Sequence, residues 1–336
     1  MLRVLATFRP DNFTLAIAAT VLAASLFPAV GQAGEVLHVV TILAIALLFF
    51  LHGARLSREA ALAGALHWRL HLTVLCATFV MFPLLGLGLR YSLASVLPES
   101  LLAGLLYLCL LPSTVQSSIA FTSIAHGNVA AAVCSASLSN FVGIFLTPAL
   151  VALLMNLKGG VSIEAVGAII LQLLLPFLAG HFLRPRIGGF VQRHRAVLGF
   201  VDRGSILLVV YLAFSEATEN GLWRVLGVSD LVKLFVVCAA LLAIVLIATV
   251  VVARRLGFDR ADEIVIVFCG SKKSLASGVP MAGVLFPLAQ VGMVVLPLML
   301  FHQIQLMVCA ALARRYANAD AATRAPEGEG ETARAG

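Results

Sequence analysis

Charged residues are scarce in this sequence, and their scarcity excludes whole classes of protein. Only 12% of its 336 residues are Asp, Glu, Lys or Arg, whereas 61% are hydrophobic and the mean hydropathy is +1.04. A water-soluble globular domain of this length needs a more polar surface. The composition therefore predicts an all-α membrane protein, because a helix satisfies its own backbone when lipid is the solvent.

Motifs of enzymes, metal centres and disulfide scaffolds are also missing. The sequence contains no H-E-x-x-H, no G-x-S-x-G and no aspartate pair within an apolar run, although a membrane enzyme needs such groups. Its six cysteines lie in apolar runs without C-x-x-C spacing, which is typical of small buried side chains. We therefore expect no enzyme activity and no cofactor.

A helix needs about 20 mostly apolar residues to span a membrane. Ten runs of residues in the sequence are apolar enough to do so. The seventh is short and carries Glu216, so it is expected to extend backwards, to tilt or to border a water-filled cavity. The first also resembles a signal peptide, but cleavage would unbalance the loop charges. The predicted spans are Phe13 to Val30, Val36 to Leu51, Leu70 to Leu89, Leu101 to Ala125, Val129 to Leu154, Ile163 to Leu183, Ser205 to Thr218, Leu231 to Ala253, Ile264 to Phe286 and Leu288 to Ala313.

The basic residues are distributed unevenly between the loops. With the N-terminus inside, seventeen of the 23 Lys and Arg residues fall in cytoplasmic segments, among them the predicted loop Arg184 to Arg203, and four fall outside. Cytoplasmic loops collect Lys and Arg. The pattern predicts a multi-pass protein of the cell membrane with both termini cytoplasmic. The formal charge of +7 is therefore explained by basic cytoplasmic loops that contact anionic lipid, and it is not a sign of nucleic-acid binding.

Two spans are interrupted by polar and helix-breaking residues. Pro112-Ser-Thr-Val-Gln-Ser-Ser118 divides the fourth, and Gly270-Ser-Lys-Lys-Ser-Leu-Ala-Ser-Gly-Val-Pro280 divides the ninth. Proline removes a backbone donor and clustered hydroxyls satisfy freed backbone groups, so both stretches suit a broken helix that borders a cavity. If only one span were interrupted, a kinked helix that packs against its neighbours would be the simpler explanation. A pair of them, with Lys272 and Lys273 inside the second, favours a functional site.

The two interrupted spans lie five positions apart, which predicts two halves of five spans each. Because five is odd, a second half with the same fold must sit inverted in the membrane, as in many transporters that work by alternating access. The predicted fold is therefore ten transmembrane helices in two inverted five-helix repeats, with broken, crossing helices four and nine. Residues 1–316 form this transporter unit, and residues 317–336 have too little apolar content to pack and are predicted to be a disordered cytoplasmic tail.

At the interrupted spans the chain resembles the bile acid:sodium symporter family, and in particular a divergent branch of bacterial members and a vertebrate relative. The likeness covers nearly the whole chain. It implies a core domain of spans three to five and eight to ten, a panel domain of spans one, two, six and seven, and an ion site where spans four and nine cross beside span five. Its most specific stretches are Leu110-Leu-Pro-Ser-Thr-Val-Gln-Ser-Ser118, Ala125-His-Gly-Asn-Val-Ala130 with Leu146-Thr-Pro148, and Cys269-Gly-Ser-Lys-Lys-Ser-Leu-Ala-Ser-Gly-Val-Pro280.

The resemblance also implies which residues would bind an ion. Ser117 matches the serine of the family's Ser-Asn pair in the fourth span, and Ser118 stands where the asparagine would be. These two are the metal ligands if sodium binds. The fifth span offers further oxygen ligands, and the choice among them stays open: Ser135, Ser137, Ser139 and Asn140.

The ninth span departs from the family pattern. The family's sodium-binding glutamate should fall next to Gly270, where this chain has Phe268 and Cys269, and the following Gln-Asn pair is replaced by Lys272 and Lys273. A fixed ammonium close to the site repels sodium, which argues against sodium coupling.

Three roles remain open for Lys272. It is a tethered cation in the vacated site, a group that exchanges protons, or the counter-ion of an anionic substrate. We favour Lys272 over Lys273, because Lys272 aligns with the family's ligand position and neighbours on a helix point about 100° apart. Its ammonium is expected to donate to the oxygens of Ser117 and Ser118.

The predicted partner is a small organic solute, with an anion favoured, coupled to sodium or to protons. A regulatory membrane protein that binds a solute without moving it is the alternative, and flux discriminates the two. In the tenth span, His302 and Gln303 are added because polar groups in lipid face protein or a cavity. The candidate binding residues are Ser113, Thr114, Gln116, Ser117, Ser118, Ser135, Ser137, Asn140, Ser271, Lys272, Lys273, Ser274, His302 and Gln303.

Overall fold

A computed structural model describes residues 12–55, 67–155 and 163–324, and the regular secondary structure of these residues is helical, joined by turns and short irregular segments. Each predicted span coincides with one helix or with consecutive helices. The elements are α2 (Asn12–Leu26), α3 (Gly31–Arg55), α5 (Trp68–Cys76), the π-helix η3 (Ala77–Met81), α6 (Phe82–Ser92), α7 (Glu99–Leu110), α8 (Gln116–Ile124), α9 (Val129–Leu154), α10 (Ile163–Arg193), α11 (Arg195–Glu219), α12 (Leu222–Val225), α13 (Val228–Arg255), α14 (Arg260–Gly270), α15 (Leu275–Leu285) and α16 (Leu288–Arg324).

Seven helical stretches in the described part of the chain are long and apolar enough to cross a membrane. Two of them are composite: α5, η3 and α6 together form one stretch, and α14 with α15 forms another. Two shorter apolar helices, α2 and α7, accompany them. The molecule is therefore an all-α protein of the kind that passes through a bilayer several times.

Two sequence predictions about the polar segments are wrong. The segment Arg184 to Arg203 is not a loop, because α10 continues to Arg193, α11 begins at Arg195, and His194 alone separates them. The tail is not disordered from residue 317, because α16 continues to Arg324, whereas residues 325–336 lie outside the described part. Charge and low hydropathy suggested irregular structure in both places, but Arg and Ala are good helix formers whether or not they can be buried.

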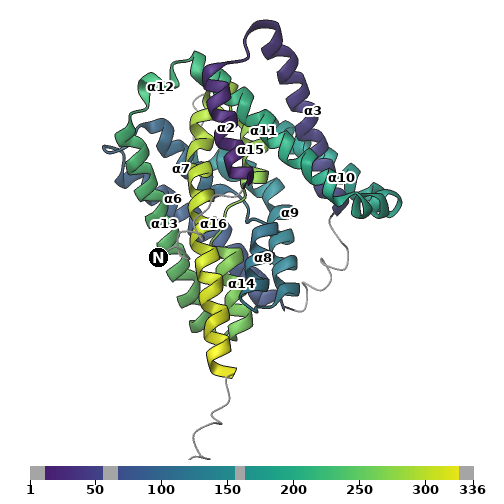
Figure 1. The fold of residues 1–336 in the computed structure, drawn as a ribbon, viewed down its shortest axis with the longest axis vertical. Helices are drawn as coiled ribbons and strands as arrows, with labels where there is room; N and C mark the ends of the chain where they lie inside the picture. The colour runs from purple at the N-terminus through teal and green to yellow at the C-terminus, as the bar shows by residue number, and fades with distance from the viewer. Residues whose placement is uncertain (1–11, 56–66, 156–162, 325–336) are drawn as a thin grey trace, which may run out of the picture.

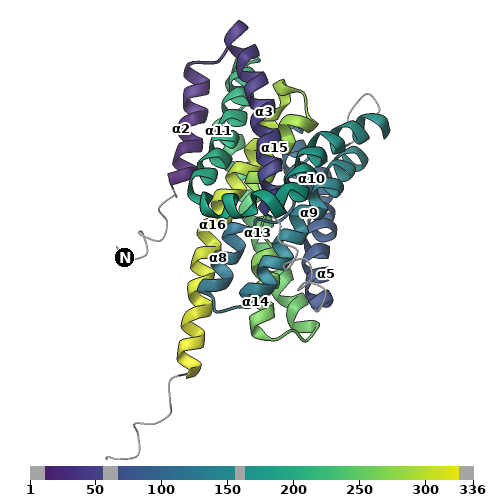
Figure 2. The same cartoon turned by 90° about the vertical axis from the view of Figure 1, so that its right-hand side faces the viewer.

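The long helix α16 runs along the longest axis of the molecule (Figure 1). It packs against α7, α8, α11, α13 and α15. In the second view α2, α3 and α11 lie at one end of the molecule, and α5, α8 and α14 lie towards the other (Figure 2). The α14–α15 stretch is the interior span: every residue from Asp262 to Leu275 is buried, whereas many large apolar side chains of α2, α3 and α13 are exposed, as suits a surface solvated by lipid.

Helices α3 and α10 cross with their backbones in close contact. A Cβ atom built on Gly53 of α3 would lie 1.9 Å from the carbonyl oxygen of Phe177, and one built on Gly180 of α10 would lie 1.9 Å from that of Phe50. Only glycine fits at both positions, and small residues at helix crossings are a common packing device in membranes. The reciprocal pair of glycines lets the backbones of α3 and α10 pack directly against each other.

Candidate functional site

The two predicted breaks are present and face each other, but they are shorter than predicted, because residues 116–118 and 275–280 are helical. Residues 111–115 separate α7 from α8, and residues 271–274 separate α14 from α15. The backbone N–H of Ser274 donates to the carbonyl of Pro112 at 2.9 Å. The Ser113 hydroxyl donates to the carbonyl of Cys269 at 2.5 Å, and the Ser118 hydroxyl donates to that of Phe268 at 2.9 Å. The breaks thus satisfy each other's backbone, as the crossing predicted from the sequence requires.

Local sequence accounts for both interruptions. At the end of α7, Leu111 is extended, with φ −79° and ψ 157°, because a residue before proline is pushed out of the helical region. The second half of the other broken helix begins at Ser274, which is also extended and whose hydroxyl accepts from the N–H of Ser277 at 3.1 Å. That arrangement is an N-cap, which serine favours.

Helix α9 connects the two breaks through Asn140. Its amide nitrogen donates to the carbonyl of Ser113 at 2.7 Å, and its amide oxygen accepts from the hydroxyl of Ser277 at 2.7 Å. The neighbouring Ser139 hydroxyl accepts from the N–H of Ser113 at 3.0 Å. Asn140 therefore holds one break against the start of the helix that follows the other.

Lys273 reaches from the second break to carbonyls outside it. Its ammonium donates to the carbonyl oxygens of Thr78 at 2.8 Å, Cys109 at 2.9 Å and Leu111 at 2.6 Å. The ammonium also lies 4.1 Å from the centre of the Phe82 ring, within the range of a cation–π contact. The side chain is fully buried.

Lys272 is equally buried but has different neighbours. Its ammonium donates to the Ser117 hydroxyl at 3.1 Å and faces the ring of Phe121 at 4.4 Å. The predicted contact with Ser118 is absent, because the Ser118 oxygen lies 3.0 Å from the Thr114 hydroxyl and donates to a backbone carbonyl. Within residues 12–55, 67–155 and 163–324, no carboxylate forms an ion pair with either lysine.

With this geometry in view, the comparison with known proteins is decisive. Residues 11–318 match the SBF-like CPA transporter family. The chain belongs to this family. It is therefore a multi-pass membrane transporter, and the resemblance read from the broken spans is confirmed.

Relatives of this transporter include bacterial and vertebrate proteins. An uncharacterized protein of Pseudomonas aeruginosa, PA2026, is 61% identical over 312 residues, which cover 92% of this chain and 94% of the relative. The Escherichia coli protein named "Putative symporter YfeH" is 59% identical over 307 residues, covering 91% and 92%. The sodium/bile acid cotransporter 7 of Rattus norvegicus is 28% identical over 318 residues, covering 93% and 94%.

Three predicted site residues of the transporter take no part in the hydrogen bonds between the two breaks. Gln116 is exposed at the start of α8. Ser135 lies 2.7 Å from His71 Nδ1. Gln303 accepts from the Thr14 hydroxyl of α2 at 2.5 Å and so connects α16 to α2.

Most of the remaining predicted residues lie in or beside the breaks. The Ser117 hydroxyl donates to that of Thr114 at 2.9 Å, and the Ser271 hydroxyl donates to its own helix at the carbonyl of Val267. His302 Nδ1 lies 2.8 Å from the amide nitrogen of Gln305, which contacts the second break. Ser137 is partly exposed on α9.

Three groups that build the crossing were not predicted. The Tyr107 hydroxyl donates to the carbonyl of Gly278 at 2.7 Å, and a tyrosine in an apolar run is a usable signal because a buried phenol needs a partner. Gln305 holds the backbone of Lys273 from both sides, accepting from its N–H and donating to its carbonyl, each at 2.9 Å. Thr78 contributes only its carbonyl, which no side-chain pattern reveals.

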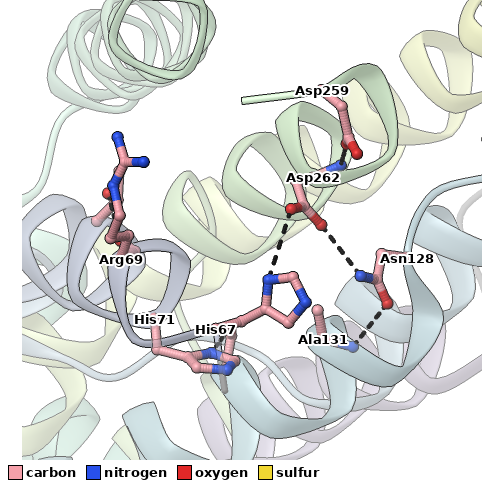
Figure 3. Close-up of polar contacts among 9 residues, drawn as sticks. His67, Arg69, His71, Asn128, Ala131, Asp259 and Asp262 are labelled. Carbon is pink, nitrogen blue, oxygen red and sulfur yellow. Dashed lines mark hydrogen bonds and ion pairs between the residues drawn. The ribbon is translucent and has the colours of Figure 1, made fainter. Parts of the chain in front are cut away.

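A second polar cluster lies at the first turn of α14 (Figure 3). Asn128 accepts from the N–H of Ala131 and so caps α9, and its amide nitrogen donates to Asp262 at 3.0 Å. His67 Nδ1 lies 3.8 Å from the same carboxylate, and Asp259 caps α14. This cluster joins the turn between α8 and α9 to the start of α14. The two broken helices are therefore in contact at two places, the crossing and this cluster.

Proposed function

We propose that this transporter moves a small organic anion by alternating access through a crossing of two broken helices. The proposed architecture has ten spans in two inverted five-helix repeats, with a core of spans three to five and eight to ten and a panel of spans one, two, six and seven. Its support is the placement of the breaks in the fourth and ninth apolar runs, where matching interruptions in two halves point to a transport site. The cell membrane, with both termini cytoplasmic, is the proposed location.

One observation carries the proposal: two ammonium groups lie fully buried at the crossing, and among the described residues they have no carboxylate partner. A buried unpaired charge is costly, and a charged side chain within a membrane span marks function by default. An anion that enters beside Lys272 would supply the missing charge. Solute binding and charge neutralisation are then the same event.

The same charges argue against sodium as the coupling ion. Two unit charges 4 Å apart interact by about 4 kcal/mol at an effective dielectric of about 20. A sodium ion next to Ser117 and Ser118 would meet the Lys272 ammonium, which donates to Ser117 at 3.1 Å. We propose that the chain needs no sodium and that Lys272 either acts as the counter-ion of the solute or carries a proton during transport.

The test begins with solute identity. Purified protein is screened by thermal unfolding against monocarboxylates, dicarboxylates, sulfate conjugates and steroid acids, each as its choline salt and its sodium salt. A ligand that stabilises the protein in both salts is then used in counterflow with proteoliposomes. Counterflow supports the transporter, whereas saturable stabilisation without flux supports the regulatory alternative.

A further inference from the structure

Adjacent lysines in one break have unequal surroundings. An ammonium has three N–H donors. All three of Lys273 are used, on the carbonyls of Thr78, Cys109 and Leu111 at 2.6 to 2.9 Å, whereas among the described residues the hydrogen-bond partner of the Lys272 ammonium is Ser117 alone.

The carbonyl of Thr78 needs Lys273 because the third span contains a π-helix followed by proline. The N–H of Phe82, which an α-helix would give to Thr78, is given to the carbonyl of Ala77 instead. The next residue, Pro83, has no N–H to give. Thr78 is thus left with a free carbonyl inside the protein, where an unpaired polar group is costly.

The carbonyls at the end of α7 are accounted for in the same way. Helix ends leave their last carbonyls without partners, and the helix dipole makes that end negative. The Thr147 hydroxyl donates to Leu110 at 2.8 Å and the N–H of Ser274 donates to Pro112 at 2.9 Å. Lys273 takes two further carbonyls, those of Cys109 and Leu111.

The backbone of Lys273 is held as firmly as its side chain. Gln305 of α16 accepts from its N–H and donates to its carbonyl, both at 2.9 Å. The residue therefore ties together the third span, the fourth span, the second break and α16. Lys272 has no such set of hydrogen bonds; its ammonium faces the Ser117 hydroxyl and the rings of Phe121 and Phe268.

We infer that the two lysines have separate tasks: Lys273 is a permanently bound internal cation that holds the crossing together, and Lys272, whose ammonium has one hydrogen-bond partner among the described residues, is the lysine that an anionic ligand would pair with. Of the three roles that the sequence left open for Lys272, the inference gives the tethered cation to Lys273 instead. The task of Lys272 rests on the proposed transport function. The task of Lys273 does not, because it concerns the folded state alone.

The matched pair Lys272→Met and Lys273→Met tests the inference in the full-length purified protein. Each variant removes one ammonium and keeps an unbranched apolar side chain. Lys273→Met leaves three buried carbonyls without donors, so its melting temperature should fall by on the order of 10 °C, or the variant should fail to fold. Lys272→Met should melt within a few degrees of the unmodified protein. Equal losses, or a larger loss for Lys272→Met, overturn the inference.

A measurement on the unmodified protein does not depend on the variants folding. Reductive methylation of the native protein, followed by fragmentation mass spectrometry, reports the reactivity of each lysine separately. Lys272 should be methylated several-fold faster than Lys273, whose donors are all engaged. Equal or faster reaction at Lys273 contradicts a fixed role. If the melting temperatures and reactivities follow the prediction but no anion is transported, the proposed function fails while the structural role of Lys273 stands.

Discussion

At the scale of single residues, the site is made of small polar groups whose partners are mostly backbone atoms. Ser113, Ser118 and Lys273 all donate to carbonyls, and Asn140 binds a carbonyl on one side and a hydroxyl on the other. Such contacts fix the shape of irregular backbone inside a membrane protein, where water is not available to satisfy it. Lys272 differs from this group, because its ammonium faces a side-chain hydroxyl and an aromatic ring.

Substitution of Asn140 measures how strongly the two breaks are held together. Asn140→Ala leaves the carbonyl of Ser113 and the hydroxyl of Ser277 without these partners, so the free energy of unfolding should fall by about 1–2 kcal/mol. Ser137→Ala is the control, because Ser137 lies on the same helix and is partly exposed. Thermal unfolding of both variants checks this, and equal melting temperatures would show that the bridge does not stabilise the crossing.

Substitution of Lys272 tests its role in transport. Lys272→Met should reduce anion uptake at least tenfold while the protein stays folded, because losing one partner of a buried charge pair costs about 2–5 kcal/mol. Lys272→Gln restores a neutral amide where the resembled family has one, and uptake by this variant should become responsive to sodium. Initial rates in proteoliposomes measure both effects. Unchanged uptake by Lys272→Met would rule out a counter-ion or proton-carrying role.

At the scale of elements, the helices themselves could be predicted from the apolar runs, and the breaks could be predicted from Pro112 and from the Gly, Ser and Pro residues of the ninth span. The sequence did not predict the contacts in which a backbone carbonyl is the hydrogen-bond acceptor. Nothing in Ala77–Met81 marks a π-helix, so the free carbonyl of Thr78 was invisible and the contacts of Lys273 could not be foreseen. Helix ends in polar segments were also missed, because hydropathy reports burial and not helix propensity.

The close crossing of α3 and α10 gives a test at this scale. Gly180→Ala would place a methyl group 1.9 Å from the carbonyl oxygen of Phe50, so the two helices must separate, and the cost should be about 3 kcal/mol or more. Gly189→Ala on the same helix meets no atom within 4 Å and should be neutral or slightly stabilising. Thermal unfolding compares the two, and similar behaviour would show that the α3–α10 contact is not needed.

At the scale of the whole molecule, orientation in the membrane is a prediction from charge. Gln32, at the start of α3, and Arg193, at the end of α10, are both exposed. In a background without the exposed Cys76, an impermeant maleimide should label Gln32→Cys in intact cells and Arg193→Cys only after permeabilisation. The reverse pattern would invert the topology.

We propose that the buried lysines at the crossing supply the positive charge that a bound sodium ion supplies in sodium-coupled transporters. The most direct measurement is the initial rate of anion uptake into proteoliposomes as external sodium is replaced by choline at constant ionic strength. We expect a rate that does not change with sodium concentration, because the positive charge at the crossing is covalently built in. A rate that falls to zero as sodium is removed would contradict it.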